Sequence, residues 1–149
     1  MITIDFEKSK LNPEQAAKVK AAVEVANKVT SGAAIGVAFK SVIFRETNGD
    51  TNEQILEKVK APITVKVWPF KSWKWFSKVV AYVNGRKDSV IHFNVKFLNA
   101  NTIGEVANTL VHESLHLKGY GHAIKPYVNT VPYRVGGIVE DLAVKAKLV

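Results

Sequence analysis

The chain has 149 residues, of which 47% are hydrophobic, so it fits one domain with a single buried core. It has no cysteine, which excludes disulfides and thiolate metal sites and leaves histidine and carboxylate groups as possible metal ligands. The N-terminal residues lack the basic start and apolar run of a secretory signal, and no apolar stretch reaches the length of a membrane span. We therefore expect a soluble protein, whose compartment the sequence does not determine.

Positive charge is concentrated in one part of the chain. The net charge is +8, and residues 58–96 contain nine lysines and arginines but one acidic residue, whereas the rest of the chain has twelve of each sign. An excess of positive charge over one segment favours an anionic partner, such as an acidic peptide, a cell-wall polymer or nucleic acid. A solvated face that aids solubility explains the pattern equally well.

The first half of the chain predicts strands around a long helix. Residues 2–6 alternate as a short strand does, and Asn12, Pro13 and Gln15 have the form of a helix start, with the helix continuing to about residue 30. A strand is predicted over residues 34–44, which are rich in β-branched and aromatic side chains. After a turn at residues 48–50, one or two helical turns are predicted within residues 51–59, followed by a strand over residues 63–68.

The second half predicts a hairpin and two helices. Strands at residues 79–83 and 89–97, joined by a turn at 84–88, should pair with each other. Thr102 and Glu105 form a capping-box pattern for a helix that ends at Gly119, and apolar spacing predicts a closing helix over residues 135–146. The expected fold is α+β or α/β: a twisted mixed sheet of about five strands, backed by the long first helix and the helix before Gly119, with a C-terminal helix.

The segment from His112 to His122 fits the pattern H-E-x-x-H-x-x-G-x-x-H at every fixed position. His112 and His116 are one turn apart on the same helix face, so both imidazoles can reach one ion about 2 Å away. Gly119 can adopt the left-handed conformation that ends a helix, which turns the chain back so that His122 supplies a third nitrogen. Three protein ligands leave a position for water, as in catalytic zinc sites, and Glu113 would be the base for that water. The alternative is a set of surface histidines on a helix that happens to end at Gly119.

With this motif, the chain resembles the metzincin superfamily of zinc peptidases. The order of predicted elements also resembles theirs: a strand, a long helix, two strands, a loop, an edge strand, a further strand, the motif helix and a closing helix. Metzincins carry a methionine-containing turn beneath the zinc, but the only methionine here is Met1. The resemblance implies that residues 129–133 take the place of that turn, with Val131 as its apolar floor.

Three tyrosines are candidates for a role beside the metal, and one further histidine lies outside the motif. Tyr133 falls where some metzincins place a tyrosine that ligates the metal and then stabilises the oxyanion, and a packed tyrosine is the alternative. Tyr120 and Tyr127 are other candidates for the same task. His92 lies outside the motif in a predicted strand, so we interpret it as a cross-strand or surface histidine.

Aromatic and basic residues alternate after the strand at 63–68. Such a pattern can bind single-stranded nucleic acid, because rings stack on bases and lysines neutralise phosphates. The resemblance instead implies the wall of a substrate cleft, and packing in the core is a third interpretation. The residues are Trp68, Phe70, Lys71, Trp73, Lys74, Trp75, Phe76 and Lys78.

The resulting expectation is a zinc metalloendopeptidase that acts on a peptide or protein, with the substrate extended along the edge strand at 79–83. Zinc would polarise the scissile carbonyl, and Glu113 would take a proton from water and deliver it to the leaving amine. Two alternatives remain: a cell-wall peptide hydrolase, which the positive segment favours, and a non-catalytic module that keeps zinc for stability, which the missing methionine favours.

Overall fold

A mixed β-sheet forms one side of the molecule in the computed structural model, which describes residues 1–72, 78–85, 87–123 and 125–149. Within these residues the sheet has four strands in the order β1-β2-β4-β3. β1, β2 and β4 are parallel neighbours, and β3 pairs antiparallel with β4 at the edge. The strands are β1 (Ile2–Ile4), β2 (Ile63–Phe70), β3 (Ala81–Val83) and β4 (Val90–Asn94).

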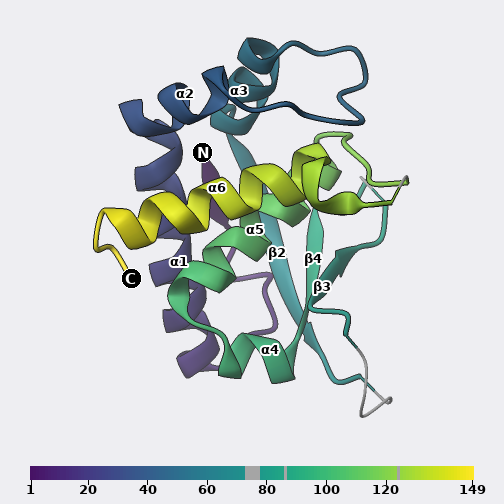
Figure 1. The fold of residues 1–149 in the computed structure, drawn as a ribbon. Helices are drawn as coiled ribbons and strands as arrows, with labels where there is room; N and C mark the ends of the chain where they lie inside the picture. Colours follow the sequence, from purple (N-terminus) through teal and green to yellow (C-terminus); the bar gives the residue numbers. More distant parts are fainter. Residues whose placement is uncertain (73–77, 86, 124) are drawn as a thin grey trace.

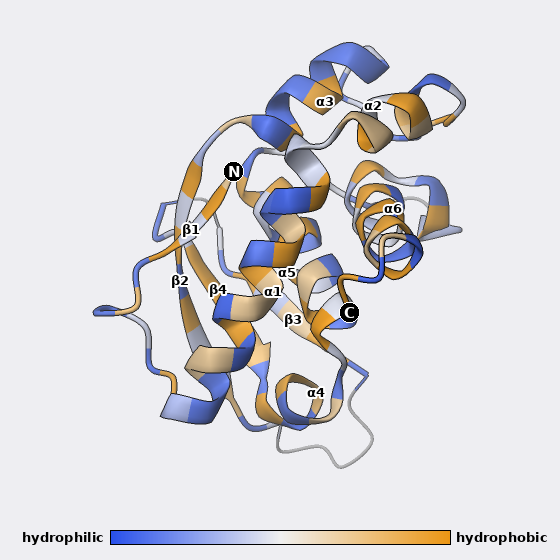
Figure 2. Cartoon of the chain, turned by 90° about the vertical axis from the view of Figure 1, so that its left-hand side faces the viewer, coloured by the Kyte–Doolittle hydropathy of each residue, from blue (hydrophilic) through white to orange (hydrophobic). Residues whose placement is uncertain are grey.

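Helices cover one face of this sheet in two layers. α1 (Pro13–Ser31) and α5 (Ile103–Leu117) lie between the sheet and α6 (Val131–Lys145), as the side view in Figure 2 shows. α6 crosses over α5 and α1, and α2 (Ala33–Lys40) and α3 (Asn52–Lys60) pack together at one end (Figure 1). α4 (Val95–Ala100) and the short 3-10 helix η1 (Tyr127–Asn129) complete the order.

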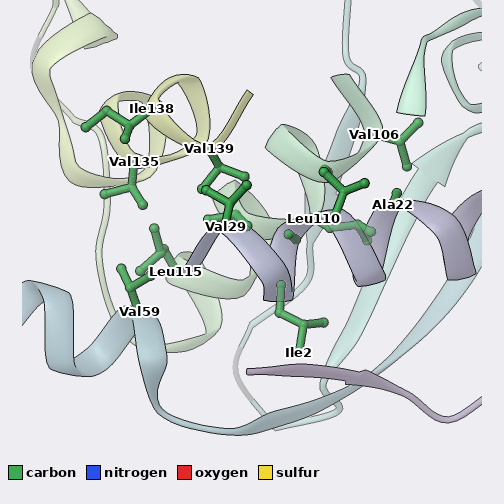
Figure 3. Packing of buried hydrophobic residues seen from close by; sticks show 14 of the residues in the cluster. Ile2, Ala22, Val29, Val59, Val106, Leu110, Leu115, Val135, Ile138 and Val139 are labelled. Carbon is green, nitrogen blue, oxygen red and sulfur yellow. The ribbon is translucent and has the colours of Figure 1, made fainter. Parts of the chain in front are cut away.

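The core is built where α5 meets α1 and α6 (Figure 3). Val106 and Leu110 of α5 are fully buried, as are Ala22 of α1 and Val139 of α6. Because Leu110 is four residues after Val106 and three after Ala107, these side chains lie on one side of α5, and their burial fixes the rotation of the helix. The opposite face of α5 is thereby turned toward β3.

Most predicted elements are present. Asn12 with Gln15 and Thr102 with Glu105 form complete capping boxes at the starts of α1 and α5. β3 and β4 form the predicted antiparallel hairpin, and the turns predicted within residues 51–59 form α3, with Thr51 as its N-cap. The closing helix is α6, which begins at Val131, before the predicted start at residue 135. No helix in the described residues has the length and apolar character needed to cross a membrane.

The predicted strand over residues 34–44 is wrong, because residues 33–40 form α2. A strand would place residues 35, 37 and 39 on one face, but Ile35 and Phe39 are buried while Val37 is 67% exposed. Burial four residues apart is the helical pattern. The sheet consequently has four strands in the described part of the chain, where about five were predicted.

The predicted strand over residues 89–97 is also too long. β4 ends at Asn94, whose Oδ1 accepts a hydrogen bond from the Lys96 backbone N–H at 3.1 Å and so caps α4. The same side chain donates from Nδ2 to the carbonyl of Val79 at 3.0 Å, which ties the end of β4 to the segment before β3.

Candidate metal centre

One face of α5 lines a cleft of about 800 Å³ between the helix and the edge of the sheet. This face carries His112, Glu113 and His116 at its C-terminal end, together with Glu105, Asn108 and Thr109 nearer its start. His112 and His116 point away from the core stripe of Val106 and Leu110, whereas Glu113, three residues after Leu110, lies at the border of that stripe and is itself buried. Burial of the apolar face therefore directs the two histidines into the cleft and places Glu113 at its buried edge.

α5 ends in a Schellman motif that turns the chain toward His122. The N–H of Gly119 donates to the carbonyl of His116 at 3.0 Å, and the N–H of Tyr120 donates to the carbonyl of Leu115 at 3.0 Å. Gly119 has a φ of 104°, a conformation that side chains disfavour, so glycine is needed here as the motif predicts. Tyr120 and Leu115 are both buried, which adds the apolar contact typical of this helix end.

The structure brings His112, His116 and His122 into one group. One ring nitrogen from each lies within 4.8 Å of the other two, and Nε2 of His112 is 3.1 Å from Nε2 of His116. Two nitrogens bound tetrahedrally to one metal at about 2 Å are separated by roughly 3.3 Å, so this pair already has the required spacing. With imidazoles as the only donors in the group, the set suits zinc and other divalent transition metals.

The neutral form of His112 and His116, which a metal requires of its imidazole ligands, is favoured by their surroundings. Burial, with smaller contributions from the neighbouring histidines, lowers the pKa of His112 to about 3. Burial also lowers the pKa of His116, whose Nδ1 lies 2.8 Å from the carbonyl of Tyr120. Because a carbonyl can only accept, Nδ1 carries the proton and Nε2 presents its lone pair to the group.

Glu113 lies beside the histidine group but is not one of its three potential ligands. Glu113 lines the cleft, and the residue is only 5% exposed. Burial raises the pKa of Glu113 to about 7, and a divalent cation nearby would oppose that rise by stabilising the carboxylate. A carboxylate in this position can accept a proton from a water molecule in the cleft.

Tyr133 lies beside the histidines, where the sequence predicted it. Its ring centroid is 4.5 Å from that of His112 and 5.0 Å from that of His122. Tyr127 also contacts this group, with its ring 5.2 Å from His122 and stacked on Tyr133 at 6.0 Å. Val131, the expected apolar floor, is fully buried at the start of α6.

The hydroxyl of Tyr120 is bound outside the histidine group, which makes Tyr120 a poor candidate for a donor to the oxyanion. Its hydroxyl donates to Oδ2 of Asp50 at 2.6 Å. Asp50 belongs to a turn, residues 46–50, that contacts the segment carrying His122 at two other points. Asn48 donates from Nδ2 to the carbonyl of Gly119 at 3.0 Å, and the N–H of Ala123 donates to Oε2 of Glu46 at 2.7 Å. The sequence marked residues 48–50 only as a turn and gave no signal of this contact.

The second wall of the cleft is the edge strand β3 with residues 78–80. The carbonyl of Val80 accepts from the N–H of Asn94 at 2.8 Å, so Val80 and Tyr82 direct their backbone groups toward β4. By the alternation of an antiparallel pair, Ala81 and Val83 direct theirs away from β4. An extended chain lying along the cleft can therefore pair with these two residues.

The aromatic and basic residues before β3 are described only in part, since Trp73, Lys74, Trp75 and Phe76 lie outside the described residues. Trp68 and Phe70 lie on the sheet face away from the helices, where Trp68 contacts the edge of His92 and Phe70 contacts Tyr82. His92 stacks on Tyr82 at 4.7 Å, which is the cross-strand packing predicted for it.

Around this cleft lie three imidazoles that can bind a metal, a buried carboxyl group and a phenol. The edge strand of the sheet lies beside them. Comparison of the chain with protein-family models, with curated proteins and with solved structures finds no match.

Proposed function

We propose that the protein is a zinc-dependent metalloendopeptidase of metzincin type. The observation that carries this proposal is that His112, His116, His122 and Glu113 face one cleft whose other wall is the edge strand β3. Three ligands leave room for water at a metal, and the strand edge offers backbone groups to an extended peptide. The complete H-E-x-x-H-x-x-G-x-x-H motif supports the same assignment.

The chain's own side chains divide the work of hydrolysis. The three histidines hold zinc, which when bound polarises the scissile carbonyl and lowers the pKa of water. Glu113 accepts the proton of the attacking water and then donates it to the leaving amine. The hydroxyl of Tyr133 donates a hydrogen bond to the negative charge that develops on the carbonyl oxygen. Ala81 and Val83 hold the substrate backbone in an extended conformation.

Metal content and cleavage test the proposal together. The purified protein should contain one zinc per chain and should cleave members of a broad peptide library. His116→Ala should contain no zinc, because two imidazoles remain. Glu113→Gln should keep its zinc and its fold but lose most of the cleavage, because an amide of nearly the same shape cannot accept the proton. Stoichiometric zinc in His116→Ala would overturn the ligand assignment, and unchanged turnover in Glu113→Gln would overturn the role of the base.

Two alternatives use the same centre. A cell-wall peptide hydrolase is favoured by the nine basic residues in segment 58–96, which suit an anionic polymer, and digestion of purified cell wall but not casein would identify it. A non-catalytic zinc module is favoured by Val131 in place of a methionine. Bound zinc that raises thermal stability, together with no cleavage of any library peptide, would identify that alternative.

A further inference from the structure

His116 depends on Tyr120 for its orientation. Nδ1 of His116 donates to the Tyr120 carbonyl at 2.8 Å, and this contact presents Nε2 to the metal group. Tyr120 also lies two residues before His122, so its backbone fixes the segment that carries the third histidine. A displacement of Tyr120 would consequently misplace two of the three ligands.

The hydroxyl group of Tyr120 is fixed by a hydrogen bond to Asp50. The residue is buried, and its hydroxyl donates to Oδ2 of Asp50 at 2.6 Å, across 70 residues of sequence. The same oxygen accepts from Nζ of Lys58 in α3 at 2.6 Å, and that ammonium group also lies 5.2 Å from the Tyr120 ring. Hydrogen bonds to an ionised acceptor are shorter and stronger than neutral ones, so this contact restrains the tyrosine firmly.

We propose that Asp50 is a positioning residue of the metal centre, acting through the Tyr120 hydroxyl on His116 and on the segment that carries His122. This inference rests on the zinc binding in the proposed function. Lys58 of α3 forms an ion pair with the Asp50 carboxylate. The position of α3 therefore affects the position of Tyr120 and, through it, of the two histidines. The Asn48 and Glu46 side chains hold the same segment by its backbone, whereas Asp50 holds it by the Tyr120 side chain, so this contact can be removed at either of its two residues.

The test measures zinc affinity at 25 °C by competition with a chromophoric chelator. Tyr120→Phe keeps the buried ring and the carbonyl that His116 uses but lacks the hydroxyl, and Asp50→Ala lacks the acceptor. Each should bind zinc more weakly, by up to about 10-fold, the lower end of the range for losing an outer partner of a metal ligand, because the carbonyl itself is retained. Asp50→Asn keeps an oxygen acceptor and should lie between Asp50→Ala and the wild type.

Thermal unfolding separates positioning from ordinary stabilisation. A residue that only stabilises the fold lowers Tm equally with excess zinc and with chelator. In Tyr120→Phe and Asp50→Ala, the gain in Tm on adding zinc should instead be smaller than in the wild type. The double variant should bind zinc no more weakly than the weaker single variant, because both changes remove one hydrogen bond.

Asp5→Asn is the matched control. Asp5 also pairs with a lysine, Lys8, at 3.2 Å, but on the surface and with no contact to the motif segment. It should leave zinc affinity unchanged. If the wild type binds no zinc, the proposed function fails. If the wild type binds zinc and Tyr120→Phe and Asp50→Ala bind it equally tightly, the proposed function stands and the positioning role of Asp50 is overturned.

Discussion

The Tyr133 ring packs edge-on against His112 and is 43% exposed at the cleft. If its hydroxyl donates to the oxyanion, Tyr133→Phe should lower kcat with little change in KM, since that interaction is formed mainly in the transition state. The expected loss is on the order of 10- to 1,000-fold, at or somewhat below the loss for one oxyanion donor. Zinc content should not change. Steady-state kinetics on a library substrate measure this effect.

Tyr127→Phe is the control for that prediction. Tyr127 contacts His122 but not His112 within the ring pairs of the described residues, so its hydroxyl should contribute less to kcat. A fully active Tyr133→Phe would show that Glu113 and the metal act without this phenol, and Tyr133 would then be a packing residue. A loss seen only in Tyr127→Phe would transfer the role to Tyr127.

At the residue level, the site residues that could be predicted from the sequence are those with a fixed local spacing. His112, Glu113 and His116 lie on one helix face, and Gly119 adopts the positive φ that the motif requires, so the spacing of the motif was enough to bring His122 to them. Asp50 could not be predicted in this way. It reaches Tyr120 only through the folded chain, and an Asp-Tyr hydrogen bond leaves no periodic pattern in the sequence.

The end of α5 is the element on which the ligand geometry depends. Gly119→Ala would place a side chain at a φ of 104°, which should cost about 1 to 2 kcal/mol of stability. It should also weaken zinc binding, since the same turn directs His122 toward the helix. Chemical denaturation and chelator competition measure the two effects.

Gly121→Ala is the matched control for this turn. Gly121 lies in the same segment, but its φ is not in the left-handed region, and among the described residues no atom beyond its two chain neighbours lies within 4 Å of the position of an added Cβ. Its stability and zinc affinity should match those of the wild type. Equal behaviour of the two alanine variants would show that the left-handed turn is not required.

The two helices predicted from capping-box patterns were correct, whereas the strand over residues 34–44, which was predicted from composition, was wrong. α1 and α5 begin at their capping boxes. α2 was predicted as a strand because its residues favour β-structure, yet that preference is weaker than the gain from burying Ile35 and Phe39 on one helical face. The end of β4 depended on one side chain, Asn94, which caps α4 as well as bonding to Val79.

For the whole molecule, the α+β class follows from the alternation of sheet and helix segments, and the structure confirms it. The layering explains why the cleft lies where it does. α5 packs against α1 and α6 on one side, so its remaining face meets the edge of the sheet. The number of strands and their order depend on long-range pairing, which local patterns do not encode.

Metal removal should lower the stability of the whole domain. At a free zinc concentration 100 times Kd, binding to the folded state adds at most about 2.7 kcal/mol, which corresponds to a rise in Tm of roughly 5 to 10 °C for a domain of this size. Calorimetry with zinc and with chelator measures the difference. His116→Ala should show none, and an equal shift in that variant would mean that zinc acts elsewhere.

The three histidines lie within residues 112–122, a feature with a consequence for the unfolded ensemble. Closing so short a loop around an ion carries little chain entropy, so the imidazoles remain at high effective concentration even when the sheet and the helices have come apart. A denatured chain that still captures zinc reduces the mass-action gain of the native state. The observed rise in Tm should therefore fall toward the lower end of that range.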